Sequence, residues 1–484
     1  MKPACSATPT SEVAPSLGGP TMGWRWFVFL ASAFILFFQL GGRGLNEPDE
    51  GRYAEVGREM LVSGDYITPQ LNGLPHYTKP PLTYWLIAIS LKLFGVNEFG
   101  ARLPSALAAM GSLFAVFLTS RRAMGEIGAL WSAVILTSSL LFISVARLIT
   151  ADMLLCCWVS WSVWALWRWS ENSERNWKFP AWFFVFLGLG LITKGPIAVV
   201  LPLFALIGLR WKNPRLQLRH LNWGRGILIT LAIALPWFLV VTWGKPEMWD
   251  YFVGRETVGR LLTNVHGRAK PWWYFAPVLV CGLLPWSNWL VVTFMMRRTW
   301  SPEEIKFVRL CITWVGGGFL LFTVSQSKLP TYGLPLMPPL AMLVALTLIR
   351  LSALVDADKW RPTAIAFLSG SWLTLLGIAV FVTVRTVRDY DLPLSQSLVP
   401  ISLVLITAFG TFLTFRLKGF LAAFGTLAAT TFALSISVVS LLPHFERHFG
   451  AKTTAKFVAL RVSEADPEKI ATLVVASEKL RYGL

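Results

Sequence analysis

Long apolar runs separated by short polar stretches dominate the pattern of this 484-residue chain. A transmembrane helix needs about 20 mostly apolar residues. Long continuous apolar runs fit such helices, whereas half-buried strands alternate apolar and polar residues. Fourteen segments qualify, near residues 23–40, 82–95, 103–120, 127–146, 152–169, 181–193, 196–210, 226–243, 273–296, 306–326, 334–350, 363–384, 398–415 and 420–442. The pattern therefore predicts an all-α polytopic membrane protein.

The second of these segments differs from the others. LTYWLIAISLKLFG, residues 82–95, is short, contains Lys92 and follows Pro80 and Pro81. A short apolar segment behind two prolines favours an interfacial or re-entrant helix over a membrane span. Thirteen transmembrane helices remain.

The distribution of basic residues tests this reading, because Lys and Arg collect in the cytoplasmic loops of membrane proteins. If residues 82–95 do not cross, one side of the membrane receives the clusters Arg121–Arg122, Arg168 to Lys178, Arg210 to Arg225, Arg297–Arg298, Lys359 to Arg361 and Arg416 to Lys418. We therefore expect thirteen spans and a cytoplasmic N-terminus.

Composition agrees with the hydrophobic pattern. The chain is 55% hydrophobic and 14% charged, whereas soluble proteins average roughly a quarter charged residues. The net charge of +18 lies in the loop clusters, so it does not indicate a nucleic-acid partner. We expect a disordered N-terminal tail at residues 1–21, a transmembrane domain at 22–442 and a short or truncated periplasmic segment at 443–484.

Ionisable residues gather in the loops on the opposite, outer side. The stretch NEPDEGRYAE, residues 46–55, holds four carboxylates: Glu47, Asp49, Glu50 and Glu55. Other outer segments contribute Lys79, Arg147, Asp152, Lys194, His266, Lys328 and Tyr332. Several lie beside a Pro or Gly that ends a helix and frees backbone groups, which predicts a polar cavity on this face.

Lysines and carboxylates on one membrane face suit transfer of a sugar from a lipid-linked phosphate. The departing phosphate needs cations to hold its developing charge. The attacking hydroxyl needs a base or an oriented acceptor, which a carboxylate provides. Asp49 or Glu50 is the candidate for that role.

Several motifs strengthen this hypothesis. The segments PDEGRYAEVGREML, LNGLPHYTKPPLTYW, ARLITADM, LITKGP, HGRAKPWWYF and SKLPTYGLPLMPPLAM closely resemble the bacterial aminoarabinose transferase family, within the protein-mannosyltransferase-like C-type glycosyltransferases. The motifs occur in the family's order over residues 41–342. The resemblance implies a C-type glycosyltransferase fold with a large first periplasmic loop. It also implies a bacterial inner-membrane enzyme that moves a sugar from undecaprenyl phosphate to an acceptor, lipid A in the aminoarabinose branch, on the periplasmic face.

The resemblance also implies roles for single residues. Asp49 resembles the group that activates the acceptor hydroxyl, with Glu50 beside it and Asp152 as a second acidic residue. The expected ligands of the donor phosphate are Lys79, Lys194 and Lys328, and the expected pocket for sugar or acceptor comprises Tyr53, His76, Thr78, Arg147, His266 and Tyr332. Structural roles stay open for three of them: a core position for Tyr53, a helix cap for Asp152 and an interfacial position for Tyr332.

Thr78 departs from the family pattern. Members of the aminoarabinose branch carry a Glu at this position, which forms a metal site with a later His; here the hydroxyl of Thr78 replaces the carboxylate while His266 is retained. A neutral hydroxyl is a poor ligand for a divalent metal. We therefore predict no cofactor and no metal site, although a divalent metal stays open as an alternative that Thr78 weakens. A neutral hexose or another amino sugar is as open as aminoarabinose.

Two other functions remain as alternatives. A protein O-mannosyltransferase shares the acidic loop and the carrier lipid but differs in its acceptor. A polyprenyl-lipid transporter also needs many helices and a phosphate site, but it favours internal duplication and midplane charges, neither of which the sequence shows.

Overall fold

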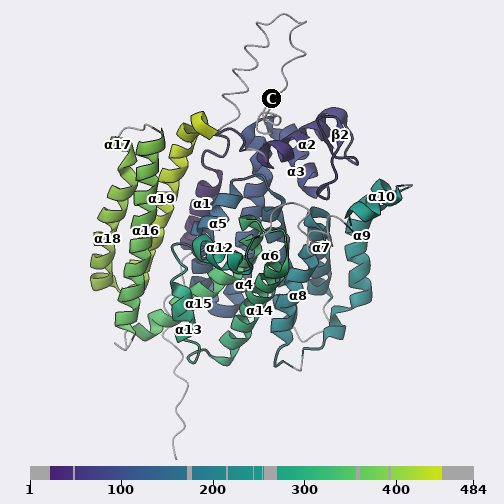
Figure 1. Ribbon diagram of the computed structural model, residues 1–484. Coiled ribbons are helices and arrows are strands. Elements are labelled where there is room, and N and C mark those ends of the chain that lie inside the picture. The colour runs from purple at the N-terminus through teal and green to yellow at the C-terminus, as the bar shows by residue number, and fades with distance from the viewer. Residues whose placement is uncertain are drawn as a thin grey trace, which may run out of the picture.

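Helices make up almost all of the computed structural model (Figure 1). Among the residues that it describes, seven helices are long and apolar enough to cross a membrane, and one bent helix pair could form an eighth span. The chain is thus a multi-pass membrane protein, while thirteen spans stay a prediction because several expected spans form shorter helices. The described residues are 22–46, 49–171, 177–213, 216–243, 245–252, 254, 270–355, 360–390 and 394–449.

The segment between α1 (Met22–Phe37) and α4 (Glu98–Ser138), which we expect on the outer side of the membrane, forms a small layer at one end of the helix bundle (Figure 1). Helix α2 (Asp49–Ser63) is followed by a two-stranded antiparallel hairpin, β1 (Gln70–Leu71) and β2 (Leu74–Pro75). Its turn residues Asn72 and Gly73 both have positive φ, as a tight hairpin requires. Helix α3 (Leu82–Phe94) packs on α2, and its 13 residues fit the expected interfacial helix.

Polar contacts show that the chain reverses direction within α4 (Glu98–Ser138). Near its start, Arg102 donates to the carbonyl of Leu40, just beyond α1 (Met22–Phe37). Glu126 instead pairs with Arg25 near the other end of α1. The reversal occurs where Met124 and Gly125 leave helical geometry, in the gap expected between the apolar segments 103–120 and 127–146.

The chain bends again at the sites that hold most candidate residues. Helix α5 (Leu140–Ala146) and α6 (Ala151–Glu171) meet at 116°. Helix α7 (Lys178–Lys194) ends at Gly195, whose φ of 82° permits a sharp exit, and Pro196 precedes α8 (Ile197–Arg210). Both breaks leave a charged residue at a helix end.

The apolar segment at 273–296 differs from expectation. It forms α12 (Phe275–Gly282) and α13 (Trp289–Met295) instead of one helix. Pro285 lies between them, and a proline lacks the N–H that a continuous helix needs. The preceding stretch contains η1 (Leu218–Leu221), α9 (Trp223–Thr242), α10 (Pro246–Trp249) and η3 (Trp272–Tyr274).

The remaining helices enclose the core. They are α14 (Pro302–Val324), η4 (Pro330–Leu336), α15 (Met337–Val355), α16 (Arg361–Tyr390), α17 (Leu394–Ser397), α18 (Val399–Lys418) and α19 (Phe420–Phe449). Helix α6 packs against α4, α7 and α8, and α15 packs against α4. In Figure 1, α16, α18 and α19 form one flank of the molecule and α7 to α9 the other. The tail at 1–21 and residues 450–484 lie outside the described part of the chain.

Candidate functional site

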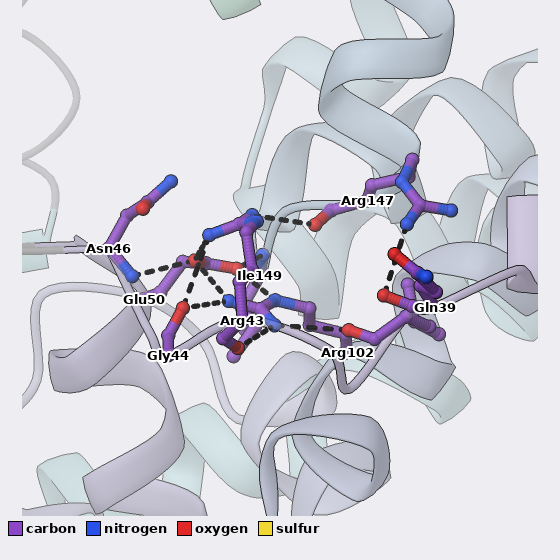
Figure 2. A network of polar contacts seen from close by, with 9 residues as sticks. Gln39, Arg43, Gly44, Asn46, Glu50, Arg102, Arg147 and Ile149 are labelled. Carbon is purple, nitrogen blue, oxygen red and sulfur yellow. Dashed lines mark hydrogen bonds and ion pairs between the residues drawn. The ribbon is translucent and has the colours of Figure 1, made fainter. Parts of the chain in front are cut away.

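Glu50 is the centre of a buried polar network at the start of α2 (Figure 2). Arg102 donates to both of its carboxylate oxygens, from Nε at 2.8 Å and from Nη2 at 2.9 Å, and Arg43 donates at 3.1 Å. The backbone N–H groups of Asn46 and Ile149 also donate to it. Burial would raise the pKa of Glu50, but the bonds and charges of these arginines outweigh burial and lower it. Glu50 is therefore ionised and fully engaged.

The arginines of this network also fasten the outer end of α1. Arg102 donates to the carbonyls of Leu40, Arg43 and Gly44. Arg147, which the sequence placed in the sugar or acceptor pocket, donates to four backbone carbonyls of Ile35, Leu36, Phe38 and Gln39. These bonds satisfy carbonyls that the end of a helix leaves unpaired.

Sequence reasoning missed Arg43 and Arg102. Arg102 is fully buried and begins an apolar segment, where a charged residue must find a partner. Its position at the edge of an apolar segment was the one signal that the sequence offered. The identity of the partner, Glu50, required the folded chain.

Asp49 differs from its neighbour Glu50. Its side chain is 49% exposed and pairs with Arg52, one turn along α2. On the same helix, Tyr53 is buried and packs against Tyr84. Burial raises the pKa of Tyr53, and Tyr84, Asp152 and Asp49 add to the increase. Asp49 and Asp152 therefore approach Tyr53 from two separate segments.

Asp152 and Lys194 form an ion pair between two helix ends. Asp152 lies in the first turn of α6, and Lys194 in the last turn of α7. The ammonium of Lys194 also lies 4.4 Å from the ring centroid of Tyr332, a cation–π distance. Three residues that the sequence singled out separately thus meet at one point.

A cavity of about 430 Å³ adjoins this ion pair. Lys79, Lys194, Thr78 and Tyr332 belong to its polar lining. Apolar residues line the remainder, from α6 to α9 and α14, among them Leu155, Leu191, Val200, Leu235, Phe238 and Leu321. Such a cavity suits a ligand with an anionic head and a long apolar tail. We call it the lysine cavity.

The segment before α3 shapes one wall of the lysine cavity. The hydroxyl of Thr78 lies 2.7 Å from Nε2 of His76, and the ammonium of Lys79 donates to the carbonyl of Thr78 at 2.8 Å. Burial, with the charges of Arg52 and Lys79, lowers the pKa of His76 to about 4. His76 is therefore neutral at pH 7.

Further residues that the sequence singled out are Lys328, His266 and Glu47. Lys328 is buried and donates to the carbonyl of Lys270 at 3.1 Å, and it does not line the lysine cavity. His266 and Glu47 lie outside the described residues. Within the described residues, no group of three or more His, Cys, Asp or Glu side chains could hold a metal ion.

Comparisons with known proteins identify related transferases. A family model described as dolichyl-phosphate-mannose-protein mannosyltransferase matches residues 78–240. An undecaprenyl phosphate-alpha-4-amino-4-deoxy-L-arabinose arabinosyl transferase 2 from Pseudomonas fluorescens strain Pf0-1 is 32% identical over 77% of this chain and 68% of its own length. The corresponding transferase from Edwardsiella ictaluri is 33% identical over 66% of this chain and 58% of its own length. The chain thus spans about three fifths to two thirds of these relatives.

A solved structure shares the fold. The crystal structure of ArnT from Cupriavidus metallidurans bound to undecaprenyl phosphate aligns with a TM-score of 0.77. The alignment covers 96% of this chain and 85% of that one, at 24% sequence identity. The chain therefore has the same polytopic helical fold.

Proposed function

The chain belongs to the family of undecaprenyl phosphate-aminoarabinose arabinosyl transferases, and from this premise we propose that it is a glycosyltransferase. It takes a sugar from an undecaprenyl phosphate carrier and passes it to a lipid acceptor similar to lipid A. The reaction takes place on the periplasmic face of a bacterial inner membrane. The observation that carries the proposal is the lysine cavity, which combines two cations with an apolar interior.

The lysine cavity fits the donor lipid. Lys79 and Lys194 lie among its lining residues, where a phosphate would meet both ammonium groups. The apolar walls formed by α7, α8 and α9 would hold the first part of the prenyl chain. Asp152 holds Lys194 at the cavity edge, so the cation is in position before the phosphate arrives.

The arrangement supports a substitution at the anomeric carbon of the sugar. The acceptor oxygen forms a bond to that carbon while the bond from the carbon to the phosphate oxygen breaks. The phosphate leaves with the electron pair, and Lys79 and Lys194 stabilise its charge. Asp49 is exposed and close to Tyr53, and it accepts the proton of the acceptor hydroxyl.

A protein acceptor is the second candidate, because the matched family model at 78–240 describes a protein mannosyltransferase. Mass spectrometry of glycolipids and glycoproteins from cells with and without this chain distinguishes the two acceptors. We expect a sugar-sized mass to disappear from a glycolipid when the chain is deleted. Loss from a glycoprotein instead would favour the second candidate, and loss from neither, with carrier-linked sugar on the wrong membrane face, would favour a transporter.

A further inference from the structure

The connection between α14 and η4 contributes a different residue to the lysine cavity from the one that the sequence selected. Lys328, the expected phosphate ligand, donates to the carbonyl of Lys270 and does not line the cavity. Its neighbour Ser327 does line the cavity and is only 3% exposed. Within the described part of the chain, the hydroxyl oxygen of Ser327 has no hydrogen-bond partner. This connection therefore adds a neutral hydroxyl, and not a cation, to the cavity wall.

The buried hydroxyl of Ser327 needs a partner, because burying a polar group without a hydrogen bond costs free energy. A ligand in the lysine cavity would supply that partner. Lys79 and Lys194 already provide donors for the phosphate of the proposed carrier. A serine hydroxyl both donates and accepts hydrogen bonds, as the hydroxyl groups of a sugar do. Ser327 therefore suits the sugar of the carrier better than its phosphate.

Thr78 adds a second hydroxyl to the same cavity, from the segment before α3. Its Oγ1 lies 2.7 Å from Nε2 of His76, which is either the donor or the acceptor of this bond. In both cases Oγ1 keeps a lone pair that can accept a further bond. Because Thr78 and Ser327 belong to separate segments of the cavity wall, the two hydroxyls can contact different hydroxyl groups of one sugar ring.

The surroundings of Thr78 disfavour a positively charged sugar. The ammonium of Lys79 donates to the carbonyl of Thr78 at 2.8 Å, so a cation already lies beside this residue. Burial and the charges of Arg52 and Lys79 lower the pKa of His76 to about 4, which shows that the position resists a further positive charge. A protonated sugar amine would place such a charge beside the same groups. An uncharged sugar avoids this repulsion.

We propose that Ser327 and Thr78 form a sugar subsite of the lysine cavity, which selects a carrier that bears an uncharged sugar such as a hexose. This inference deepens the proposed function and rests on it, because a sugar subsite beside a phosphate site requires a carrier with a sugar attached. The two residues orient the sugar and take no part in making or breaking bonds. The amino sugar in the names of the relatives is therefore not the sugar that we expect for this chain.

Removing each hydroxyl tests the subsite. Native mass spectrometry in nanodiscs would measure the binding of undecaprenyl phosphate with and without an attached glucose. We expect Ser327→Ala and Thr78→Val each to weaken binding of the glucose-bearing carrier about fivefold, the effect of one lost hydrogen bond. Binding of undecaprenyl phosphate without sugar should stay unchanged. Thr323→Val is the matched control, because Thr323 also has a buried hydroxyl without a partner in the described chain but does not line the cavity.

The charge of the sugar provides a second test, on the wild-type protein. Undecaprenyl phosphate bearing aminoarabinose would be compared with the same carrier after acetylation of its amine, which removes the positive charge. We expect the amine-bearing carrier to bind about tenfold more weakly than its acetylated form and than the glucose-bearing carrier. Equal or tighter binding of the amine-bearing carrier would overturn the proposed selectivity.

The remaining outcomes separate this inference from the proposed function. If Ser327→Ala and Thr78→Val weaken undecaprenyl phosphate as much as the glucose-bearing carrier, these residues contact the phosphate or support the cavity wall. The sugar subsite is then wrong and the proposed function stands. If the wild-type protein binds none of the carriers, or transfers no sugar to lipid A or to a protein, the proposed function fails and this inference fails with it.

Discussion

Two adjacent acidic residues, Asp49 and Glu50, have opposite surroundings, and we expect this difference to separate a catalytic role from a structural one. Glu50 is buried under Arg43 and Arg102, whereas Asp49 is half exposed beside Arg52. We expect Asp49→Asn to lower turnover about 10²-fold or more by removing the base, with carrier binding and stability kept. Glu50→Gln should instead cost about 3–5 kcal/mol of stability, because it removes the partner of a buried charge.

Turnover assays and thermal denaturation in detergent would measure the two variants side by side. Asp65→Asn is the control, because the carboxylate of Asp65 accepts hydrogen bonds only within a local turn, from the N–H groups of Ile67 and Thr68. Full activity in Asp49→Asn would contradict its role. A stable but inactive Glu50→Gln would show that Glu50 takes part in the chemistry.

We predict that Lys79 and Lys194 bind the donor phosphate. Replacing either by Ala should weaken carrier binding and transfer together, by about 2–5 kcal/mol if the phosphate is desolvated. Lys92, exposed on α3, provides the control through Lys92→Ala. Carrier binding is measured by native mass spectrometry and transfer by product formation.

Lys194→Ala removes a cation from the phosphate site, and it also leaves Asp152 without its partner. Replacing both residues by neutral ones separates the loss of phosphate binding from the loss of stability. The double variant Lys194→Gln with Asp152→Asn removes both charges and should recover stability without recovering phosphate binding. Normal carrier binding in that variant would exclude Lys194 from the phosphate site.

His76 predicts a pH dependence of stability. Its pKa is about 4 in the folded chain, below the ordinary value of 6.5. The unfolded chain therefore binds more protons between these values, and stability falls as pH drops from 6.5 towards 4. His76→Gln should flatten this loss while leaving stability above pH 7 unchanged. Melting temperatures of both proteins across this range provide the measurement, and identical slopes would contradict the assignment.

At the scale of helices, the short helix α3 determines the topology. It packs on α2 at the end of the bundle that holds the outer loop (Figure 1), so the chain should stay outside between α2 and α4. In a chain whose native cysteines are replaced, we expect Val96→Cys to be labelled by an impermeant thiol reagent in intact cells. Arg122→Cys, on the opposite side, should react only after permeabilisation. Reversed labelling would contradict the topology.

The sequence predicted helices better than their interruptions. The gap between segments 103–120 and 127–146 was visible because Arg121 and Arg122 lie there. The break at Pro285 was not, because the surrounding residues are continuously apolar and hydropathy alone does not report a lost backbone donor. An apolar pattern indicates that a segment is surrounded by lipid or by the protein interior. It does not indicate where the backbone of that segment bends.

The candidate site was predicted in part for a similar reason. Asp152, Lys194 and Tyr332 each stood out at a helix end, and the fold brings them together. Their pairing could not be read from one sequence, because it depends on how α6, α7 and η4 pack. Arg102 escaped notice because a buried arginine is recognised only through its partner, 52 residues away.

At the scale of the whole molecule, the candidate carboxylates Asp49, Glu50 and Asp152 each pair with a cation, and this bears on metal binding. Asp49 pairs with Arg52, Glu50 with Arg102 and Asp152 with Lys194. Carboxylates that already pair with cations are poor candidates for a shared metal ion, and the hydroxyl of Thr78 is neutral and therefore a poor metal ligand. We therefore predict that transfer does not depend on a divalent metal.

Transfer activity in nanodiscs should accordingly persist after treatment with a chelator, and adding Mg²⁺ or Zn²⁺ afterwards should change it little. A chelator that does not enter the site would leave a bound metal in place, so elemental analysis of the purified protein accompanies the assay. If chelation abolishes transfer and a divalent ion restores it, Thr78 does not prevent metal binding. Asp49 and His266 would then be the first candidate ligands to replace, because the carboxylate of Asp49 is half exposed and His266 is the histidine that the sequence singled out for such a site.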